Sequence, residues 1–500
     1  MFSRISSSRT SPRLLALLLT SMLLVTACGD DSDQKPLQDQ DTGVLADAGD
    51  IGADAQQDAQ HDAGQDAQQD SGDSIVRDKP LDEFVADDSD FSYEVAWEKS
   101  STVANSWLLD VTSGEWRSSE EVDRTTWRHD VILTVPKNAD TTTALVIING
   151  GDNDGGSPAQ NDDEVSTAEL VATLVRTPVV SISQIPNQPL TIFGEGEDMV
   201  EDDLVASSWY KAIETGDPTW SAYFPMARAV VRSMDAVQDH MDGLDQPVDN
   251  FVLTGFSKRG ATTYLATAAD PRVIAMAPGV FDFLNFRPQA AHHLAVYGEP
   301  APAVADYAEY NLLERVADPD AQVLLDTSDP YAYRDRFTMP KLIMASPGDQ
   351  FFLPDAMRFY IDDIPGETLV RYVPNTGHGL VPEGEELLDT IKPLVEWYKA
   401  IANDQARPTV SWTHDAGELT MTTSTEPDSV KLWTATNDQA RNFRIDVVGA
   451  IWESQELTAD TNGDYTATVD APAAGYTAYL IEATFGQEIY TTQVYVTPDD

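Results

Sequence analysis

The pattern of apolar and polar positions separates the chain into segments of different character. Residues 29–79 are rich in Asp, Gln and Ala and offer almost nothing apolar to bury, whereas residues 80–405 alternate short apolar runs with amphipathic stretches. From residue 406 to residue 500, apolar and polar positions alternate over short strands. We therefore expect an α/β domain followed by a small all-β domain.

Within residues 80–405 the continuous apolar runs are typical of strands buried on both faces of a sheet, and the 3.6-residue periodicity predicts helices between them. This alternation predicts a doubly wound, mainly parallel sheet. The predicted strands cover residues 101–109, 127–135, 144–149, 178–185, 251–254, 273–278, 341–345 and 368–373. The predicted helices cover residues 165–176, 204–214, 226–241, 261–269 and 387–401, and the aromatic stretch 286–337 is expected to form a helical cover.

The second domain is predicted to be an immunoglobulin-like sandwich, because about seven short strands fit into residues 406–500. Asn462-Gly463 is a hairpin signal. Asp460, Asn462 and Asp464 resemble part of a calcium loop, but the glycine is misplaced and no glutamate closes it, so a plain turn is the better interpretation. The domain either binds carbohydrate or supports the first domain. The predicted strands are 409–414, 418–423, 429–436, 444–448, 465–469, 477–484 and 491–496.

Charge and cysteine content narrow the range of functions. The chain has 84 Asp and Glu residues against 31 Lys and Arg residues, a formal net charge of -53, which argues against nucleic acid or a bare anionic membrane as a partner. Cys28 is the sole cysteine, so the chain has no intramolecular disulfide, cysteine metal site or thiol nucleophile.

The first 28 residues predict export. Three arginines precede an apolar run at residues 14–25 that is too short to span a bilayer and suits a signal peptide. The run ends in Leu-Val-Thr-Ala-Cys, which resembles a bacterial lipobox with Cys28 as the lipidated residue. Gly29 after the cysteine resembles outer-membrane sorting. Residues 29–79 are then expected to be a disordered, self-repelling tether in which the aspartates lack the fixed geometry that calcium binding needs.

Residues 250–260, NFVLTGFSKRG, are the strongest candidate for chemistry. An expected strand, a turn carrying Ser257 and an expected helix form the layout of a nucleophile elbow. The usual motif is GxSxG, but here Arg259 stands at the second glycine position and Gly260 follows one residue later. Taken alone, the serine is equally consistent with an ordinary helix cap.

Candidate partners for Ser257 follow later strands. Asp349 comes after the strand at 341–345, and His378 comes after the strand at 368–373, which gives the Ser, Asp, His order of α/β-hydrolases. His378 would act as the base and Asp349 would orient it. Asp282, which follows the strand at 273–278, is the alternative acid.

Two further features lie near this predicted triad. Gly150 and Gly151 end the strand at 144–149, where a backbone N–H can support an oxyanion, although the stretch is also consistent with a flexible acidic loop. Lys258 and Arg259 either bind a substrate carboxylate or the oxyanion, or pair with the acidic residues 195–203 and brace the elbow.

The same residues resemble the PhoPQ-activated pathogenicity-related protein family of α/β-hydrolase-like proteins. The resemblance covers roughly residues 82–403 and implies that Ser-Lys-Arg-Gly is the family's own elbow, while it leaves the substrate open. The motifs that carry it are IPNQPL at 185–190, the segment 201–220 ending TGDPTW, GFSKRGATTYLATAADPRV at 255–273, PGDQFFLPD at 347–355 and PNTGHGL at 374–380.

The expected organisation is a lipoprotein signal peptide at 1–28, a tether at 29–79, an α/β-hydrolase domain at 80–405 and a β-sandwich at 406–500. The expected function is a membrane-anchored serine hydrolase that cleaves an ester or amide of a small molecule or peptide through an acyl-enzyme on Ser257, without a metal or other cofactor. The alternatives are an aminopeptidase-like peptidase, in which the acidic segment holds an ammonium group, and a carbohydrate esterase, since GFSKRG resembles glucuronoyl esterases. The third alternative is a non-catalytic surface adhesion or signalling protein with the same fold.

Overall fold

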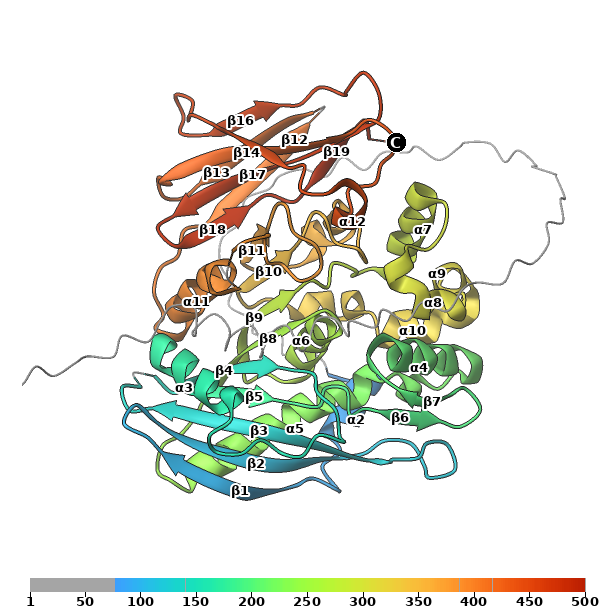
Figure 1. The fold of residues 1–500 in the computed structure, drawn as a ribbon, viewed down its shortest axis with the longest axis vertical. Helices are drawn as coiled ribbons and strands as arrows, with labels where there is room; N and C mark the ends of the chain where they lie inside the picture. The colour runs from blue at the N-terminus through green and yellow to red at the C-terminus, as the bar shows by residue number, and fades with distance from the viewer. Residues whose placement is uncertain (1–76, 140, 386, 416, 500) are drawn as a thin grey trace, which may run out of the picture. The chain divides into compact units, whose positions relative to one another are not determined.

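One 14-stranded sheet runs through the part of the chain that the computed structural model describes, residues 77–499 except 140, 386 and 416 (Figure 1). The predicted signal peptide, Cys28 and most of the predicted tether lie outside the described residues. Among the helices that are described, none is both long and apolar enough to cross a membrane.

The first nine strands of the sheet lie in the order β1-β2-β3-β5-β4-β8-β9-β10-β11. The six from β5 to β11 are mutually parallel, whereas β1, β2 and β3 pair antiparallel at one edge. The α/β prediction is therefore confirmed, with a mixed sheet like that of α/β-hydrolases. The strands are β1 (Ser92–Ser100), β2 (Ala104–Glu115), β3 (Thr126–Pro136), β4 (Thr143–Ile148), β5 (Val179–Ile182), β8 (Asn250–Phe256), β9 (Val273–Gly279), β10 (Lys341–Ala345) and β11 (Thr368–Tyr372).

Helices cover both faces of the sheet. Successive side chains of a strand point to opposite faces, so neighbouring residues of one strand lie in different cores. In β4, Val146 and Ile148 belong to one apolar core and Leu145 belongs to another. Helices α3 (Asp163–Val175) and α11 (Leu387–Ala402) contribute to the core of Leu145. Helices α2 (Pro80–Ala86), α5 (Tyr223–Asp242) and α6 (Lys258–Ala269) contribute to the other.

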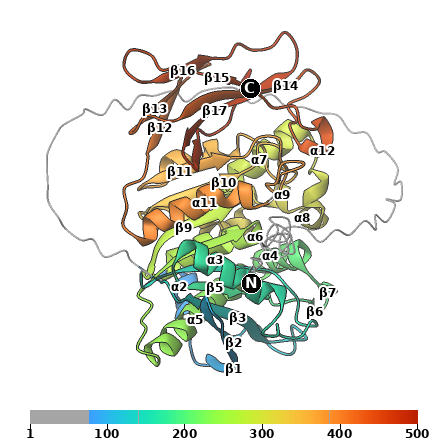
Figure 2. The same ribbon diagram turned by 60° about the vertical axis from the view of Figure 1, so that its left-hand side comes forward.

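The region that was hardest to interpret from sequence, residues 286–337, forms four short helices. With α4 (Glu201–Thr215) and the hairpin of β6 (Leu190–Ile192) and β7 (Gly196–Met199), they lie together beside the start of α6 (Figures 1 and 2). We call the four helices the cover: α7 (Phe286–Tyr297), α8 (Ala305–Glu309), α9 (Leu312–Arg315) and α10 (Gln322–Thr327). Short 3-10 turns are Pro218–Trp220, Pro302–Val304, Pro319–Ala321, Pro330–Arg336, Ala356–Phe359 and Ile361–Asp363.

The C-terminal strands form two layers. A three-stranded sheet packs its apolar side chains, such as Leu419 and Met421, into the same core as Leu432 and Ile481 of the main sheet. The strands are thus present, while the immunoglobulin-like topology stays a prediction. The separate sheet holds β12 (Val410–Asp415), β13 (Glu418–Thr423) and β16 (Tyr465–Thr468), and the main sheet continues with β14 (Ser429–Asn437), β15 (Glu453–Glu456), β17 (Tyr476–Phe485), β18 (Glu488–Thr491) and β19 (Tyr495–Thr497).

Three details of this part differ from the prediction. Residues 444–448 are not a strand, because helix α12 (Ile445–Val448) forms there and Ile445 donates its N–H to Gly348 O at 2.9 Å. Asn462-Gly463 lies in a turn but not in a hairpin, because β15 pairs with β14 and β16 pairs with β13 in the other sheet. The strand expected at 491–496 is divided between the end of β18 and the start of β19.

A buried ion pair lies where the two sets of strands meet. Val370 of β11 pairs with Thr491 of β18, and the Tyr372 N–H donates to Thr491 Oγ1 at 3.0 Å. Beside this pairing, Arg371 and Glu482 approach to 2.7 Å with side chains only 9% and 8% exposed. The charged pair therefore couples the α/β part of the structure to the C-terminal strands in a water-poor environment.

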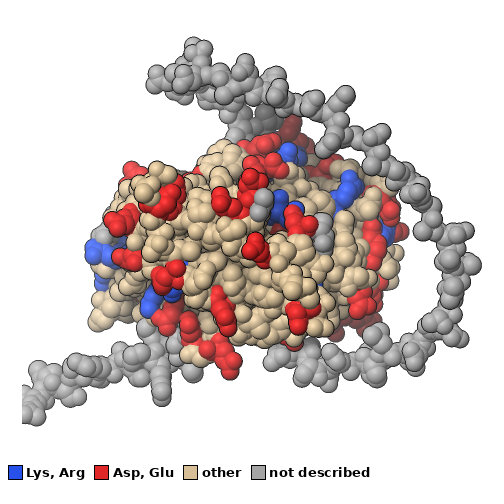
Figure 3. All heavy atoms as spheres, turned by 90° about the horizontal axis from the view of Figure 1, so that it is seen from above, with Lys and Arg blue, Asp and Glu red and all other residues tan. Residues whose placement is uncertain are grey.

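Acidic side chains are spread over the end of the molecule that the C-terminal strands form, with few Lys or Arg between them (Figure 3). This distribution agrees with the formal net charge of -53. An anionic polymer would be repelled at this end.

We predict that removal of either partner of the Arg371–Glu482 pair destabilises the protein strongly. Arg371→Met should lower the free energy of unfolding by about 3–5 kcal/mol, because Glu482 is left as an uncompensated buried charge. The double variant Arg371→Met/Glu482→Met should lose less than the two single losses combined. Urea unfolding followed by circular dichroism measures all three variants.

Lys392→Met is the surface control for that series, since its pair with Asp389 is about half exposed, at 44% and 51%. It should change the free energy of unfolding by less than about 1 kcal/mol. Simple additivity of the two single losses in the double variant would contradict the proposed coupling.

Candidate active site

Ser257 occupies a sharp turn between β8 and α6. Its backbone angles are φ 58° and ψ −130°, and its N–H donates to Gly279 O of the neighbouring strand at 2.9 Å. A positive φ on a non-glycine residue costs energy and is maintained where the surrounding structure holds it. The turn therefore has the strained backbone of a nucleophile elbow and presents Ser257 at the carboxyl end of β8.

The glycines of the elbow are required by close backbone contacts. A Cβ on Gly255 would stand 2.6 Å from Arg259 O, and a Cβ on Gly260 would stand 2.8 Å from Gly279 O and 2.9 Å from Phe281 Cβ. The position that leaves no room for a side chain is therefore residue 260 instead of residue 259. This explains why the second glycine of the motif comes one residue late.

Arg259 points away from the catalytic pocket and into a buried polar contact. Its side chain is fully buried, its Nε donates to Ile185 O at 2.6 Å, and its guanidinium reaches Glu201 at 2.5 Å. The guanidinium also fills the space where a Cβ on Gly150 would stand. Arg259 therefore ties the elbow to the loop after β4, to the segment after β5 and to the start of α4.

Lys258 joins the same network. Its ammonium lies 2.8 Å from Glu201 and 3.1 Å from Asp202, and its side chain is 4% exposed. Burial alone would raise the pKa of Glu201, but Lys258 and Arg259 outweigh it and hold that pKa at about 2. We call Glu201, Asp202, Lys258 and Arg259 the elbow network. Its two cations balance its two carboxylates, which agrees with the bracing interpretation.

His378 and Asp349 lie together at the ends of β11 and β10. His378 Nδ1 stands 2.8 Å from Asp349 Oδ2 and 3.1 Å from Oδ1, and both side chains are buried. The Phe351 N–H also donates to Asp349 Oδ1, at 2.8 Å. His378 Nε2 is buried and has no hydrogen-bond partner among the described residues. The imidazole is thus oriented through one nitrogen and leaves the other for chemistry.

Backbone packing fixes the loops that carry these two residues. Gln350 Oε1 accepts the His378 N–H at 2.8 Å, and Ser346 Oγ donates to Thr376 O at 2.7 Å. A Cβ on Gly348 would stand 2.5 Å from Thr376 O. The loop after β10 and the loop after β11 therefore lie backbone against backbone, which sets the spacing of acid and base.

Asp282, the alternative acid, has other partners. Tyr372 and Tyr360 donate their hydroxyls to its carboxylate at 2.6 and 2.7 Å. Burial raises the pKa of Asp282 to about 7 despite these two donors, and the nearby charge of Asp349 contributes. The structure thus brings Asp349, and not Asp282, into contact with the imidazole.

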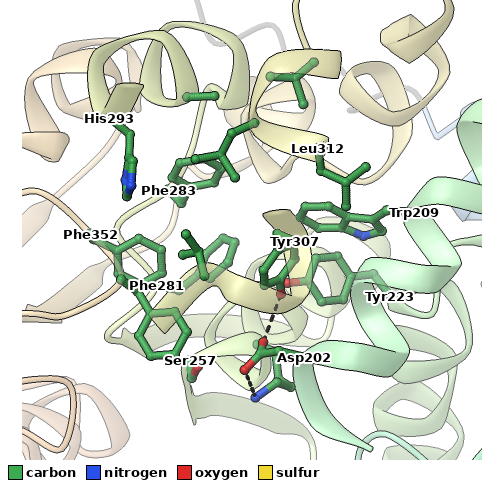
Figure 4. A pocket seen from close by; sticks show the side chains of 16 residues that line it. Asp202, Trp209, Tyr223, Ser257, Phe281, Phe283, His293, Tyr307, Leu312 and Phe352 are labelled. Carbon is green, nitrogen blue, oxygen red and sulfur yellow. Dashed lines mark hydrogen bonds and ion pairs between the residues drawn. The ribbon is translucent and has the colours of Figure 1, made fainter. Parts of the chain in front are cut away.

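A small aromatic cavity adjoins Ser257, with a free volume of about 60 Å³. Figure 4 shows Ser257 and Asp202 on one side of it and His293 and Leu312 on the other. Phe351 and Phe352 line the cavity and also contact the His378 ring, with centroid distances of 4.4 and 6.0 Å. These two rings connect the cavity of Ser257 with the Asp349–His378 pair.

The cover contributes cavity residues that the sequence did not identify. Tyr307 of α8 donates its hydroxyl to Asp202 at 2.9 Å, which ties the cover to the elbow network (Figure 4). His293 of α7 accepts the Ala301 N–H at 3.0 Å, and burial lowers the pKa of His293 to about 4, so its ring is neutral. The sequence around His293, within α7, gave no signal beyond the aromatic content of residues 286–337.

The two glycines predicted for the oxyanion site do not line the cavity of Ser257. Gly150 and Gly151 line a second, polar cavity of about 280 Å³, together with Asp130 and Glu164. Gly150 touches the elbow only through Arg259. The Lys258 backbone N–H is the first of α6 and has no acceptor within the described chain. This N–H, at a helix N-terminus, is the donor best placed for an oxyanion.

The described residues contain no group of three or more His, Cys, Asp or Glu side chains placed to hold a metal ion.

Comparison with known proteins gives one family match over most of the chain. The family model described as PhoPQ-activated pathogenicity-related protein matches residues 81–444. Autocrine proliferation repressor protein A of Dictyostelium discoideum is 35% identical over 432 residues, which cover 81% of this chain and 86% of that protein.

Two solved esterase structures resemble the chain more distantly. Acetyl xylan esterase 1 from Thermoanaerobacterium sp. JW/SL YS485 is 14% identical with a TM-score of 0.42, and the match covers 64% of this chain and 93% of that one. The acetyl xylan esterase from Paenibacillus sp. R4 is 13% identical with a TM-score of 0.44, over 64% and 95%. Similarity at this level carries no argument about activity.

We predict that Asp282 makes stability fall as pH rises between about 4 and 7. The folded protein keeps a proton on Asp282 in this range that the unfolded chain releases, so the slope of the unfolding free energy against pH is negative. Asp282→Asn should remove the contribution of this one proton, so the slope should become less negative by up to about 1.4 kcal/mol per pH unit. Urea unfolding at several pH values measures the difference.

Asp329→Asn is the matched variant, because burial raises the pKa of Asp329 to about 7 as well. It should flatten the same slope by a similar amount. Parallel curves for wild type and Asp282→Asn would show that Asp282 is ionised in the folded protein at neutral pH.

Proposed function

The chain belongs to the PhoPQ-activated pathogenicity-related protein family, and from that premise we propose that it is a serine hydrolase that cleaves an ester or amide through an acyl-enzyme on Ser257. The observation that carries the proposal is the orientation of His378. Asp349 holds its Nδ1, and its Nε2 is buried and unpaired within the described residues, next to rings that line the cavity of Ser257.

The proposed reaction follows from these positions. Ser257 Oγ attacks the carbonyl carbon while His378 Nε2 takes its proton, and Asp349 stabilises the imidazolium that forms. The tetrahedral oxyanion accepts a hydrogen bond from the Lys258 N–H at the N-terminus of α6. His378 then returns the proton to the leaving group, and a water molecule releases the acyl group by the same sequence of steps.

The cavity beside Ser257 favours a small acyl group. Its free volume is about 60 Å³, and apolar and aromatic side chains make up most of its wall. Trp209 and Tyr223 belong to this wall. Burial of a short apolar acyl chain among such rings is favourable, whereas a long chain has no room.

The contacts of the acidic segment do not favour the aminopeptidase alternative. A peptidase of that type needs a free carboxylate for the substrate ammonium, and Glu201 and Asp202 are already bound to Lys258 and Arg259. We therefore propose an esterase ahead of a peptidase.

A non-catalytic signalling role is the second candidate. It is favoured by one observation, the 35% identity to a protein named autocrine proliferation repressor protein A. Membrane anchoring through a lipid on Cys28 is also part of the proposal, and it is supported by the sequence of residues 1–28.

We predict that a fluorophosphonate probe labels the wild-type protein and does not label Ser257→Ala. The probe reacts with a serine that an adjacent base activates, so labelling reports the nucleophile directly. Ser221→Ala is the matched control, because the Ser221 hydroxyl is buried without a partner among the described residues. Folded wild-type protein that resists the probe would favour the signalling role.

We predict that Asp349→Asn lowers kcat for 4-nitrophenyl acetate on the order of 10³–10⁴-fold, because the imidazole loses its orienting charge. Asp282→Asn should stay within about tenfold of wild type, since Asp282 contacts tyrosines and not His378. Steady-state kinetics on both variants decides between the two carboxylates. The reverse order of effects would make Asp282 the acid.

A further inference from the structure

A third cavity, of about 500 Å³, lies between the α/β part and the C-terminal strands. One wall comes from the 3-10 turns Ala356–Phe359 and Ile361–Asp363, and the other from β12 and the segment leading into β19. Ser257 does not line this groove.

Aromatic rings form one side of the groove. His414 stacks on Tyr495 with a centroid distance of 3.9 Å and an interplanar angle of 18°, and its Nε2 lies 2.7 Å from the Tyr479 hydroxyl. Trp412 lines the same wall and is only partly buried. Flat, fixed rings that remain in contact with a solvent-filled groove can receive the C–H face of a flat ligand.

A buried amide beside these rings lacks a partner. Gln493 is 6% exposed, its Nε2 donates to the Tyr495 hydroxyl at 2.9 Å, and its Oε1 has no hydrogen bond within the described chain. If the amide were turned over, its nitrogen would be unpaired instead. A buried polar group without a partner is costly, and Gln493 lines the groove, so rotation of its amide toward the groove would let a ligand hydroxyl satisfy it.

The charges in the groove do not suit an anionic ligand. Among its lining residues Arg358 is the sole Lys or Arg, and it is bound to Asp499 at 2.7 Å and lies 3.4 Å from Asp355. Arg441 also binds Asp355, at 2.9 Å. Asp362 remains exposed, and a carboxylate of this kind accepts hydrogen bonds from hydroxyl groups.

We propose that this groove binds a neutral oligosaccharide. Sugar rings stack on Trp412 and on the His414–Tyr495 pair, and their hydroxyl groups bind Gln493 Oε1 and the Asp362 carboxylate. The loop that carries Asp349 and Phe351 continues into Asp355 and Arg358, so the bound glycan lies against an element that also shapes the catalytic site.

Isothermal titration calorimetry with full-length protein tests the proposal, using cellohexaose, xylohexaose and N,N′,N″-triacetylchitotriose as neutral probes. Wild type and Ser257→Ala should bind at least one of them equally. Trp412→Ala and Gln493→Leu should weaken that binding about tenfold or more, a loss of about 1.4 kcal/mol. Gln493→Leu is the sharper variant, because it removes the unpaired Oε1 at the expense of one hydrogen bond, from Nε2 to the Tyr495 hydroxyl, and circular dichroism confirms that the variant is folded.

Trp433→Ala is the matched control, since Trp433 is a partly buried tryptophan of β14 that does not line the groove. It should keep wild-type affinity. Failure of folded wild type to bind any neutral probe would overturn the proposal, as would equal affinity in Gln493→Leu. Preferential binding of hexalysine or of an oligogalacturonide, lost at high salt, would also overturn it. Binding by Ser257→Ala keeps this test separate from the hydrolase proposal.

Discussion

The architecture of the site depends on the balance of charge beneath the elbow. Arg259 is completely buried and Lys258 nearly so, and a buried cation without a partner would be prohibitively costly. Glu201 at the start of α4 forms ion pairs with both cations, and Asp202 forms one with Lys258. Ile185 O accepts a hydrogen bond from the Arg259 Nε. Removal of any one partner would leave a buried charge, so α4 and the elbow must assemble together.

The same network organises the catalytic cavity. Asp202 forms an ion pair with Lys258 and accepts a hydrogen bond from Tyr307 of the cover. The cover helices are short, and isolated helices of that length are unstable in water, so they depend on such contacts. Because the cationic side chains are engaged here, the backbone N–H of Lys258 is the donor that remains for the oxyanion of the proposed reaction.

Much of this was accessible from sequence, for identifiable reasons. The continuous apolar run of β10 and the Ser257, Asp349, His378 order are local signals, and the elbow forms where they indicated. The pairing of Arg259 with the acidic residues 195–203 was one of two interpretations, and Glu201 now carries it. The contact of Arg259 with Ile185 O was not foreseen, because Ile185 is distant in the chain and no alternation rule relates the two residues. Residues 444–448 look like a strand in sequence, yet Ile445 docks on Gly348, and a five-residue pattern cannot reveal such a tertiary contact.

Asp282 and Asp349 show how two similar carboxylates acquire different roles. Both follow parallel strands at the same edge of the sheet, and the charge of Asp349 is one reason why the pKa of Asp282 rises to about 7. A proton on Asp282 removes a like charge from the neighbourhood of Asp349. Asp349 contacts Nδ1 of His378, while Asp282 links Tyr360 and Tyr372 within the core. The two carboxylates that were rivals from sequence are thus separated by their partners, because Asp282 binds two tyrosine hydroxyls and Asp349 binds the imidazole of His378.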